Sequence, residues 1–194
     1  MPCEKKSANT IDRTMIPYVL NTCRLVLLPV QAKEAAELHA IFAQADVYRY
    51  LTDGVPMPLS WVEDIIRDSD TTFQERGLGL WSVREHGARP IIGLTGFRHF
   101  YHQPVFELIY ALRPAYWHRG LATEMAQAVI AYAFTHRRLC TIRASTDEPN
   151  HASARVMARL GMRPHGRTSM TDASDIGWDQ LHFILSYEDW RARH

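Results

Sequence analysis

The chain has 194 residues, of which 46% are hydrophobic and 22% are charged, and its formal net charge is +1. This length suits one substantial domain, and the near-neutral charge gives no basic stripe for a nucleic-acid interface. No run approaches the roughly 18 apolar residues that a membrane span requires, so we expect neither nucleic-acid nor membrane partners.

The N-terminal segment differs in character from the rest of the chain. It begins with charged and polar residues and lacks the apolar stretch of a secretory signal. Cys3, Cys23 and Cys140 are odd in number and far apart, which favours free thiols in a reducing compartment over a disulfide framework. We therefore expect a cytoplasmic protein with an extension over residues 1–22 and a single domain over 23–194.

The first part of this domain reads as one strand and two helices. Short Val- and Leu-rich runs indicate strands, apolar residues at three- and four-residue spacing indicate helices, and Gly and Pro mark turns. These patterns predict a strand at 24–30, helices at 32–44 and 59–77, and a loop at 51–58. Ser60 and Glu63 have the spacing of a capping box, so we expect Ser60 to cap the second helix.

The second part contains further strands and two more helices. Strand-like runs at 78–85, 91–100 and 106–112 are separated by short turns, which predicts an antiparallel meander. A long amphipathic helix follows at 121–138, then a strand at 140–146, a helix at 152–161, and two strands around a polar loop at 169–179. The expected fold class is α+β, with one mixed sheet of about seven strands and about four helices.

A strand-to-helix turn is the first candidate binding site. Residues 115–124 read AYWHRGLATE, so the helix would begin directly after Gly120. A helix N-terminus exposes unpaired N–H groups, Gly120 has no Cβ to block a ligand, and Arg119 adds a positive charge, which together favour an anion. Walker A and Rossmann glycine patterns are absent. On this pattern alone, an ordinary turn with an N-terminal glycine is an equally good interpretation.

The surrounding motifs resemble a known family. The string YWxRGxATE follows FELIYALRP, and IIGLTGF and PNxxSxRVMxRLGM lie before and after it. In this order they resemble the acetyl-CoA-binding motifs of the GNAT superfamily of N-acyltransferases, and more narrowly its RimJ/RimL branch of ribosomal-protein N-terminal acetyltransferases. The resemblance covers residues 24 to 190. It implies the GNAT fold, with a mixed, mostly antiparallel central sheet that splays near its fourth strand.

The resemblance also implies which residues bind acetyl-CoA. Backbone groups of Tyr110, Ala111 and Leu112 would bond the pantetheine arm and the thioester, and Asn150 would contact the pantetheine. The amides that would hold the pyrophosphate are those of His118, Arg119, Gly120, Leu121, Ala122 and Thr123. Trp117 stands where the general family pattern has Gln or Arg, so its side chain supplies no charge.

Asn150 and Ser153 form a second constellation, at the start of the helix over 152–161. Asn is a favoured N-cap, so Asn150 is explained by capping as well as by cofactor contact. Many relatives carry a Tyr seven residues after this Asn as the acid for the CoA thiolate. Here that position is Met157, which cannot donate a proton. Ser153 is the available substitute, directly or through water.

Glu107 is the candidate general base. It interrupts the apolar strand FELIYAL, and strand alternation puts it on the same face as Ile109 and Ala111. A carboxylate beside a cleft can accept a proton from an amine. The alternative is a solvated carboxylate near a strand end.

Two weaker signals have simpler explanations. His99 and His102 are closely spaced but face opposite ways on an extended chain, and no carboxylate or Cys completes a ligand set, so we expect no metal. Asp53, in the loop at 51–58, could bind a cationic amine, but an Asp before Gly is also typical of a plain turn.

These observations predict a single-domain GNAT N-acetyltransferase that uses acetyl-CoA to acetylate a primary amine by direct transfer in a ternary complex. The acceptor is either a protein N-terminus or a small molecule, and the chain a monomer or homodimer. The alternative is a non-catalytic module that binds or senses acyl-CoA.

Overall fold

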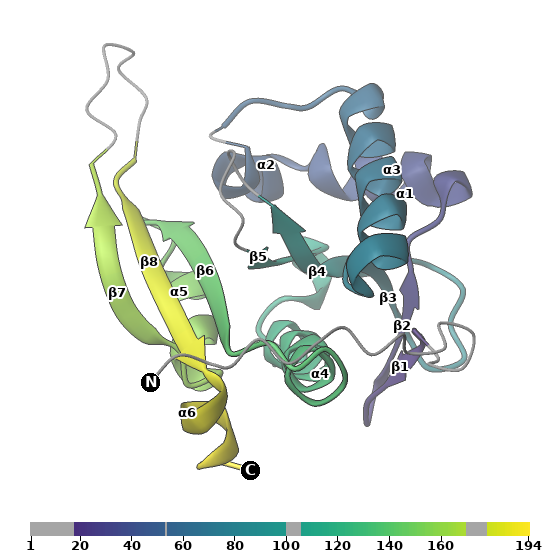
Figure 1. Cartoon of the computed structure of the whole chain (residues 1–194). Helices are drawn as coiled ribbons and strands as arrows, with labels where there is room; N and C mark the ends of the chain where they lie inside the picture. Colours follow the sequence, from purple (N-terminus) through teal and green to yellow (C-terminus); the bar gives the residue numbers. More distant parts are fainter. Residues whose placement is uncertain (1–17, 53, 100–105, 170–177) are drawn as a thin grey trace.

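A single eight-stranded sheet organises the chain (Figure 1). The structure, a computed structural model, describes residues 18–52, 54–99, 106–169 and 178–194. The strands are β1 (Leu20–Asn21), β2 (Leu25–Pro29), β3 (Leu80–Glu85), β4 (Gly93–His99), β5 (Phe106–Leu112), β6 (Thr141–Asp147), β7 (Arg163–Thr168) and β8 (Gln180–Ser186). Their order in the sheet is β1-β2-β3-β4-β5-β6-β8-β7, and only the β5–β6 pair is parallel.

Among the described residues, six α-helices cover the two faces of the sheet. They are α1 (Ala35–Phe42), α2 (Ala45–Leu51), α3 (Leu59–Arg76), α4 (Leu121–His136), α5 (His151–Arg159) and α6 (Tyr187–Arg191), with 3-10 turns at Ala32–Glu34 and Pro114–Tyr116. The predicted α+β class, mixed sheet and β3–β4–β5 meander are confirmed. The sheet and its flanking helices have the predicted GNAT arrangement.

Two apolar clusters, on opposite faces of the sheet, form the core. One joins the sheet to α4 and α5, and the other joins it to α1, α2 and α3. Strand β5 contributes to both because alternate side chains point to opposite faces. Leu108 and Leu112 belong to the α4 cluster, and Ala111 belongs to the α1 cluster with Ile109 packed against it.

Four local details differ from the sequence predictions. The eighth strand, β1, pairs with β2 at residues 20–21, inside the segment predicted as an extension. Two short helices were not predicted, namely α2 and α6. Helix α6 begins at Tyr187, after the N-cap Ser186, whose side chain accepts a hydrogen bond from the Asp189 amide. The predicted cap at Ser60 is wrong, because α3 begins at Leu59 after Pro58, which leaves Ser60 inside the first turn.

The sheet opens between β5 and β6. In the part of the chain that the structure describes, these strands are paired only at Glu107 and Arg143, whereas β4 and β5 are paired along seven positions. Figure 1 shows the consequence: β6, β7 and β8 form one wing with α5, and β1 to β5 form the other, with α4 below the junction. Because β5 is the fourth of the strands predicted from the sequence, the opening lies where the family resemblance implies.

Candidate functional site

The opening in the sheet is a cavity of about 770 Å³. Its walls come from β5, the turn before α4, the first residues of α4, β6 and α5, with further residues from α2, β7 and β8. Segments far apart in the sequence therefore meet at one site. Each sequence-predicted site residue except Arg119 lines this cavity.

The edge of β5 supplies backbone groups to the cavity. In an antiparallel pair, alternate residues direct their N–H and C=O groups toward the neighbour. Arg113 N–H donates to Ile92 O, so the residues of β5 that bond β4 are the odd-numbered ones, including Ala111. Tyr110 and Leu112 face the opening instead. The prediction that Ala111 offers its backbone to a ligand is therefore wrong, although the residue lines the cavity.

Trp117 limits what Leu112 can offer. Its indole Nε1–H donates to the Leu112 carbonyl at 2.9 Å, although the side chain is otherwise 37% exposed. The carbonyl of Leu112 already has this partner, so its N–H remains the group directed into the opening. Trp117 supplies no charge, as expected, but it braces the turn against the end of β5.

Gly120 and the start of α4 form the turn. Gly120 is the N-cap with φ of 75°, and His118 also has a positive φ, of 60°. The first backbone bond of the helix runs from Glu124 N to Gly120 O, which leaves the amides of Leu121, Ala122 and Thr123 without helical partners. Within the described part of the chain, the buried Thr123 hydroxyl also has no hydrogen-bond partner. This concentration of free donors suits an anion.

Arg119 does not point into this donor cluster. Its guanidinium donates to Glu85 at 2.7 Å and lies over the Tyr116 ring, 5.3 Å from the ring centroid. The expectation that the Arg119 charge reaches the anion site is therefore wrong. Its carbonyl has a structural role, because it accepts a hydrogen bond from Arg24.

Arg24, the residue before β2, holds the turn through contacts that no local sequence pattern indicates. Its guanidinium donates to Arg119 O at 2.9 Å and to Glu124 at 2.7 Å, and Thr22 donates to the same carboxylate at 2.6 Å. Burial raises the pKa of Glu124, but the hydrogen bonds from Thr22 and Arg24 and the Arg24 charge outweigh it and hold the pKa below its ordinary value. Glu124 therefore remains ionised, and the Arg24 guanidinium compensates its negative charge beside the anion site.

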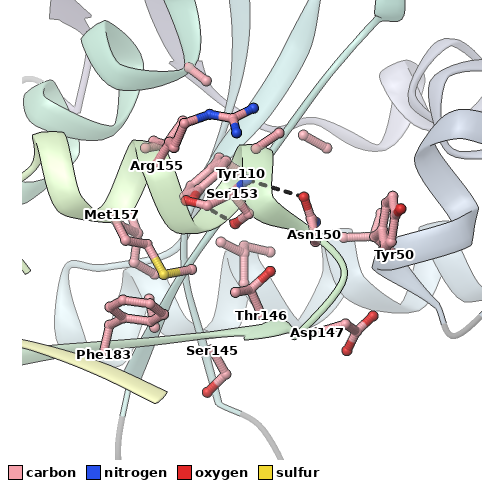
Figure 2. A pocket seen from close by; sticks show the side chains of 18 of the residues that line it. Tyr50, Tyr110, Ser145, Thr146, Asp147, Asn150, Ser153, Arg155, Met157 and Phe183 are labelled. Atoms are coloured by element: carbon pink, nitrogen blue, oxygen red, sulfur yellow. Dashed lines mark hydrogen bonds between the residues drawn. The ribbon is translucent and has the colours of Figure 1, made fainter. Parts of the chain in front are cut away.

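Asn150, Ser153 and Tyr110 meet at the start of α5 (Figure 2). Asn150 Oδ1 accepts a hydrogen bond from Ser153 N at 3.1 Å, which makes Asn150 a true N-cap. The Tyr110 hydroxyl lies 2.8 Å from Ser153 Oγ and 3.1 Å from Ser153 O. This contact bridges β5 and α5 across the opening, and nothing in the local sequence pattern indicates it.

The Tyr110 hydroxyl stays protonated over the ordinary pH range. Burial raises its pKa to about 12, against a smaller lowering by the hydrogen bond with Ser153. It can therefore donate to Ser153. Met157, at the position where many relatives have Tyr, is buried and lies near Phe183 in Figure 2, so it contributes packing rather than a proton.

The opposite face of the opening carries polar side chains. Glu107 and Arg143 lie on this face at the single β5–β6 pair. Beyond them, Ser145 Oγ lies 2.9 Å from His182 Nδ1, and Thr168 Oγ1 lies 2.7 Å from His182 Nε2. All these residues line the cavity, and the sequence analysis identified only Glu107 among them.

The described residues contain no cluster of three or more potential metal ligands. The predicted pair of histidines is not tested, because His102 and the side chain of His99 lie outside these residues, as does Asp53. In the same part of the chain, no helix is both long and apolar enough to cross a bilayer.

The fold and the site together are those of an acyl-CoA-dependent acetyltransferase. Residues 24–163 match the family model described as an acetyltransferase (GNAT) domain, so the chain belongs to the GNAT family. The chain is 26% identical over 150 residues to the uncharacterized N-acetyltransferase YoaA of Bacillus subtilis (strain 168), covering 76% of this chain and 84% of that protein.

Solved structures share the fold. A GNAT-family acetyltransferase from Bacillus anthracis superposes with a TM-score of 0.72 at 23% identity, over 88% of this chain and 99% of that one. RimL, a ribosomal L7/L12 alpha-N-protein acetyltransferase solved with coenzyme A, gives a TM-score of 0.72 at 13% identity, over 87% and 97% of the two chains.

Proposed function

We propose that this protein transfers the acetyl group of acetyl-CoA directly to a primary amine in a ternary complex. One observation carries the proposal: the cavity joins an anion-binding helix start, a free strand edge, a hydroxyl pair and a carboxylate within one opening of the sheet. The helix start can bind the phosphates of an acyl carrier, and the hydroxyl pair and the carboxylate can take part in acyl transfer.

The turn and the strand edge are the proposed cofactor contacts. The amides of Leu121, Ala122 and Thr123 would hold the pyrophosphate, because they lack helical partners and Gly120 leaves the approach open. The free edge of β5 at Tyr110 would bond the pantetheine arm as an added strand. Asn150 would contribute through groups not used in capping Ser153 N. The donor set fits the cofactor without a metal ion.

Glu107 is the proposed base and Ser153 the proposed acid. The amine loses a proton to the Glu107 carboxylate, directly or through water, and its nitrogen forms a bond to the acetyl carbon. The carbon–sulfur bond then breaks, and the sulfur takes up a proton as it leaves as a thiol. The Tyr110 hydroxyl, 2.8 Å from Ser153 Oγ, would hold the Ser153 side chain in position to protonate the departing sulfur.

Direct transfer requires no nucleophile on the enzyme. Cys23 and Cys140 are both exposed, and neither lines the cavity. Cys3 lies outside the described residues. A covalent acetyl-cysteine therefore has no support at this site, whereas binding both substrates in one opening supplies proximity and orientation.

The acceptor amine belongs to one of two classes, a protein N-terminus or a small molecule. Similarity of fold to RimL supports a protein N-terminus as one class of acceptor, as proposed from the RimJ/RimL-like motifs. The cavity also has room for a small-molecule amine. Fold does not fix the substrate, so the choice depends on the acceptor wall.

A thiol-release assay tests the proposal. The full chain is incubated with acetyl-CoA and a panel of peptides, polyamines and amino acids, and product masses are read in parallel. Amine-dependent release of CoA with a gain of one acetyl group is expected. Tight CoA binding without turnover on any amine would instead favour a non-catalytic acyl-CoA sensor.

A further inference from the structure

Glu107 and Arg143 form a pair of opposite charges at the apex of the opening. They are Cα partners on parallel strands, and within the described residues β5 and β6 pair at this position alone. Paired residues point to the same face of a sheet, so both side chains are on the face opposite Ser153 and Tyr110. Both are half-buried, and both line the cavity.

Neither charge has a partner among the residues that the structure describes. No hydrogen bond, ion pair or aromatic contact engages either side chain, although their Cα atoms are neighbours. Other partly buried arginines are engaged: Arg84 pairs with Glu34, and Arg113 donates to the Ile91 carbonyl at 2.7 Å. A half-buried guanidinium loses part of its hydration. Arg143 has no hydrogen-bond acceptor among the described residues, so it is suited to bind a ligand that carries an acceptor.

Arg98, the β4 residue paired with Glu107, places its guanidinium over the Trp61 ring and does not line the cavity. Arg155 and Arg159 line the cavity, but they belong to α5 on the other face. Beyond Arg143, Ser145 and Thr168 each contact a ring nitrogen of His182, and Tyr50 of α2 also lines the cavity. The wall therefore presents the Arg143 guanidinium, the carboxylates of Glu107 and Asp147, and hydrogen-bonding groups, and Asp46 of α2 also lines the cavity.

We propose that the acceptor is an amine that carries a carboxylate within a few bonds, of which a free α-amino acid is the simplest. Arg143 binds the carboxylate through its planar pair of N–H donors, and Glu107 receives the ammonium group. This inference rests on the proposed acetyl transfer and narrows its acceptor. A bidentate guanidinium–carboxylate contact also orients the amine, because it fixes both the position and the plane of the anion.

The wild-type enzyme provides the first test. Free amino acids are compared with the matching amides and amino alcohols, which keep the amine but lack the carboxylate, and with a polyamine. Peptides with Asp or Asn at the second position show whether a side-chain carboxylate can substitute. We expect kcat/KM to fall about 10- to 100-fold when the carboxylate is removed, the range of one charge-assisted interaction.

Variants of Arg143 provide the second test. Arg143→Gln should raise KM about 10- to 100-fold for carboxylate-bearing acceptors, leave acceptors without a carboxylate nearly unchanged, and retain CoA affinity. Arg143→Lys should recover part of the loss because it keeps the charge but not the fork. Arg76→Gln, at an exposed position at the end of α3, is the matched control for charge removal.

Three results would overturn the inference while leaving the acetyltransferase proposal intact. Amides or polyamines could be acetylated as well as free amino acids. Arg143→Gln could leave the preference for carboxylate acceptors unchanged. Arg143→Gln could also lower kcat equally for every acceptor at constant KM, which would indicate that Arg143 stabilises the oxyanion of the transition state instead. Absence of turnover with every amine would refute the proposed function itself.

Discussion

Replacing Gly120 tests the assignment of the anion site most directly. Gly120 has φ of 75°, a conformation that costs a residue with a Cβ about 1–2 kcal/mol. A Cβ there would meet only the Arg24 guanidinium, at 3.7 Å, so the protein itself leaves space for it. In Gly120→Val the new side chain would occupy the approach to the helix amides. Losing one or two charge-assisted hydrogen bonds should weaken CoA binding about 10- to 100-fold.

Gly87→Val is the matched control for this variant. Gly87 has a φ of 74°, nothing lies within 4 Å of a Cβ built on it, and it does not line the cavity. Both variants should therefore lose similar stability in thermal unfolding, while only Gly120→Val loses CoA affinity in titration calorimetry. Equal CoA affinity in the two folded variants would refute the pyrophosphate assignment.

Three further predictions concern titratable groups. Glu107→Gln should lower kcat about 100-fold or more while CoA affinity is retained, and an unchanged kcat would exclude Glu107 as the base. The raised pKa of Tyr110 means that the folded state holds its proton more tightly, so stability falls as pH rises from about 10 to 12; this loss should be smaller in Tyr110→Phe, measured by urea unfolding. Because the pKa of Glu124 is lowered in the folded state, its contribution to the free energy of unfolding is present above about pH 4.3 and is lost as the pH falls below that value. Arg24→Gln should therefore show less acid destabilisation than the wild type between about pH 5 and 3.

Local patterns were enough to predict most of the elements. Helix α4 ends at His136, close to the end of the range 121–138 expected from the sequence. The sequence was sufficient here because the apolar face of this helix is long and regular. The meander of β3, β4 and β5 was predictable for the same reason. Helix α2 was missed because seven residues carry too little periodicity to be recognised between a helix and a Gly/Pro loop.

The site itself was predictable only where a single segment defines it. Gly120, Asn150 and Ser153 lie in short motifs, and the structure brings them to one cavity. The contacts Tyr110–Ser153 and Arg24–Glu124 join residues 43 and 100 positions apart, which no local pattern encodes. The Ala111 prediction failed for a related reason: which edge of β5 is free depends on its register with β4.

The narrow pairing of β5 with β6 has a consequence for solubility. Past Glu107, β5 has an unpaired edge, and exposed edges of this kind invite pairing with strands of other molecules and aggregation. Here the edge faces the wing of β6 and α5 across the cavity rather than open solvent. The fold thus protects the unpaired edge of β5 from strands of other molecules and leaves it accessible to a ligand.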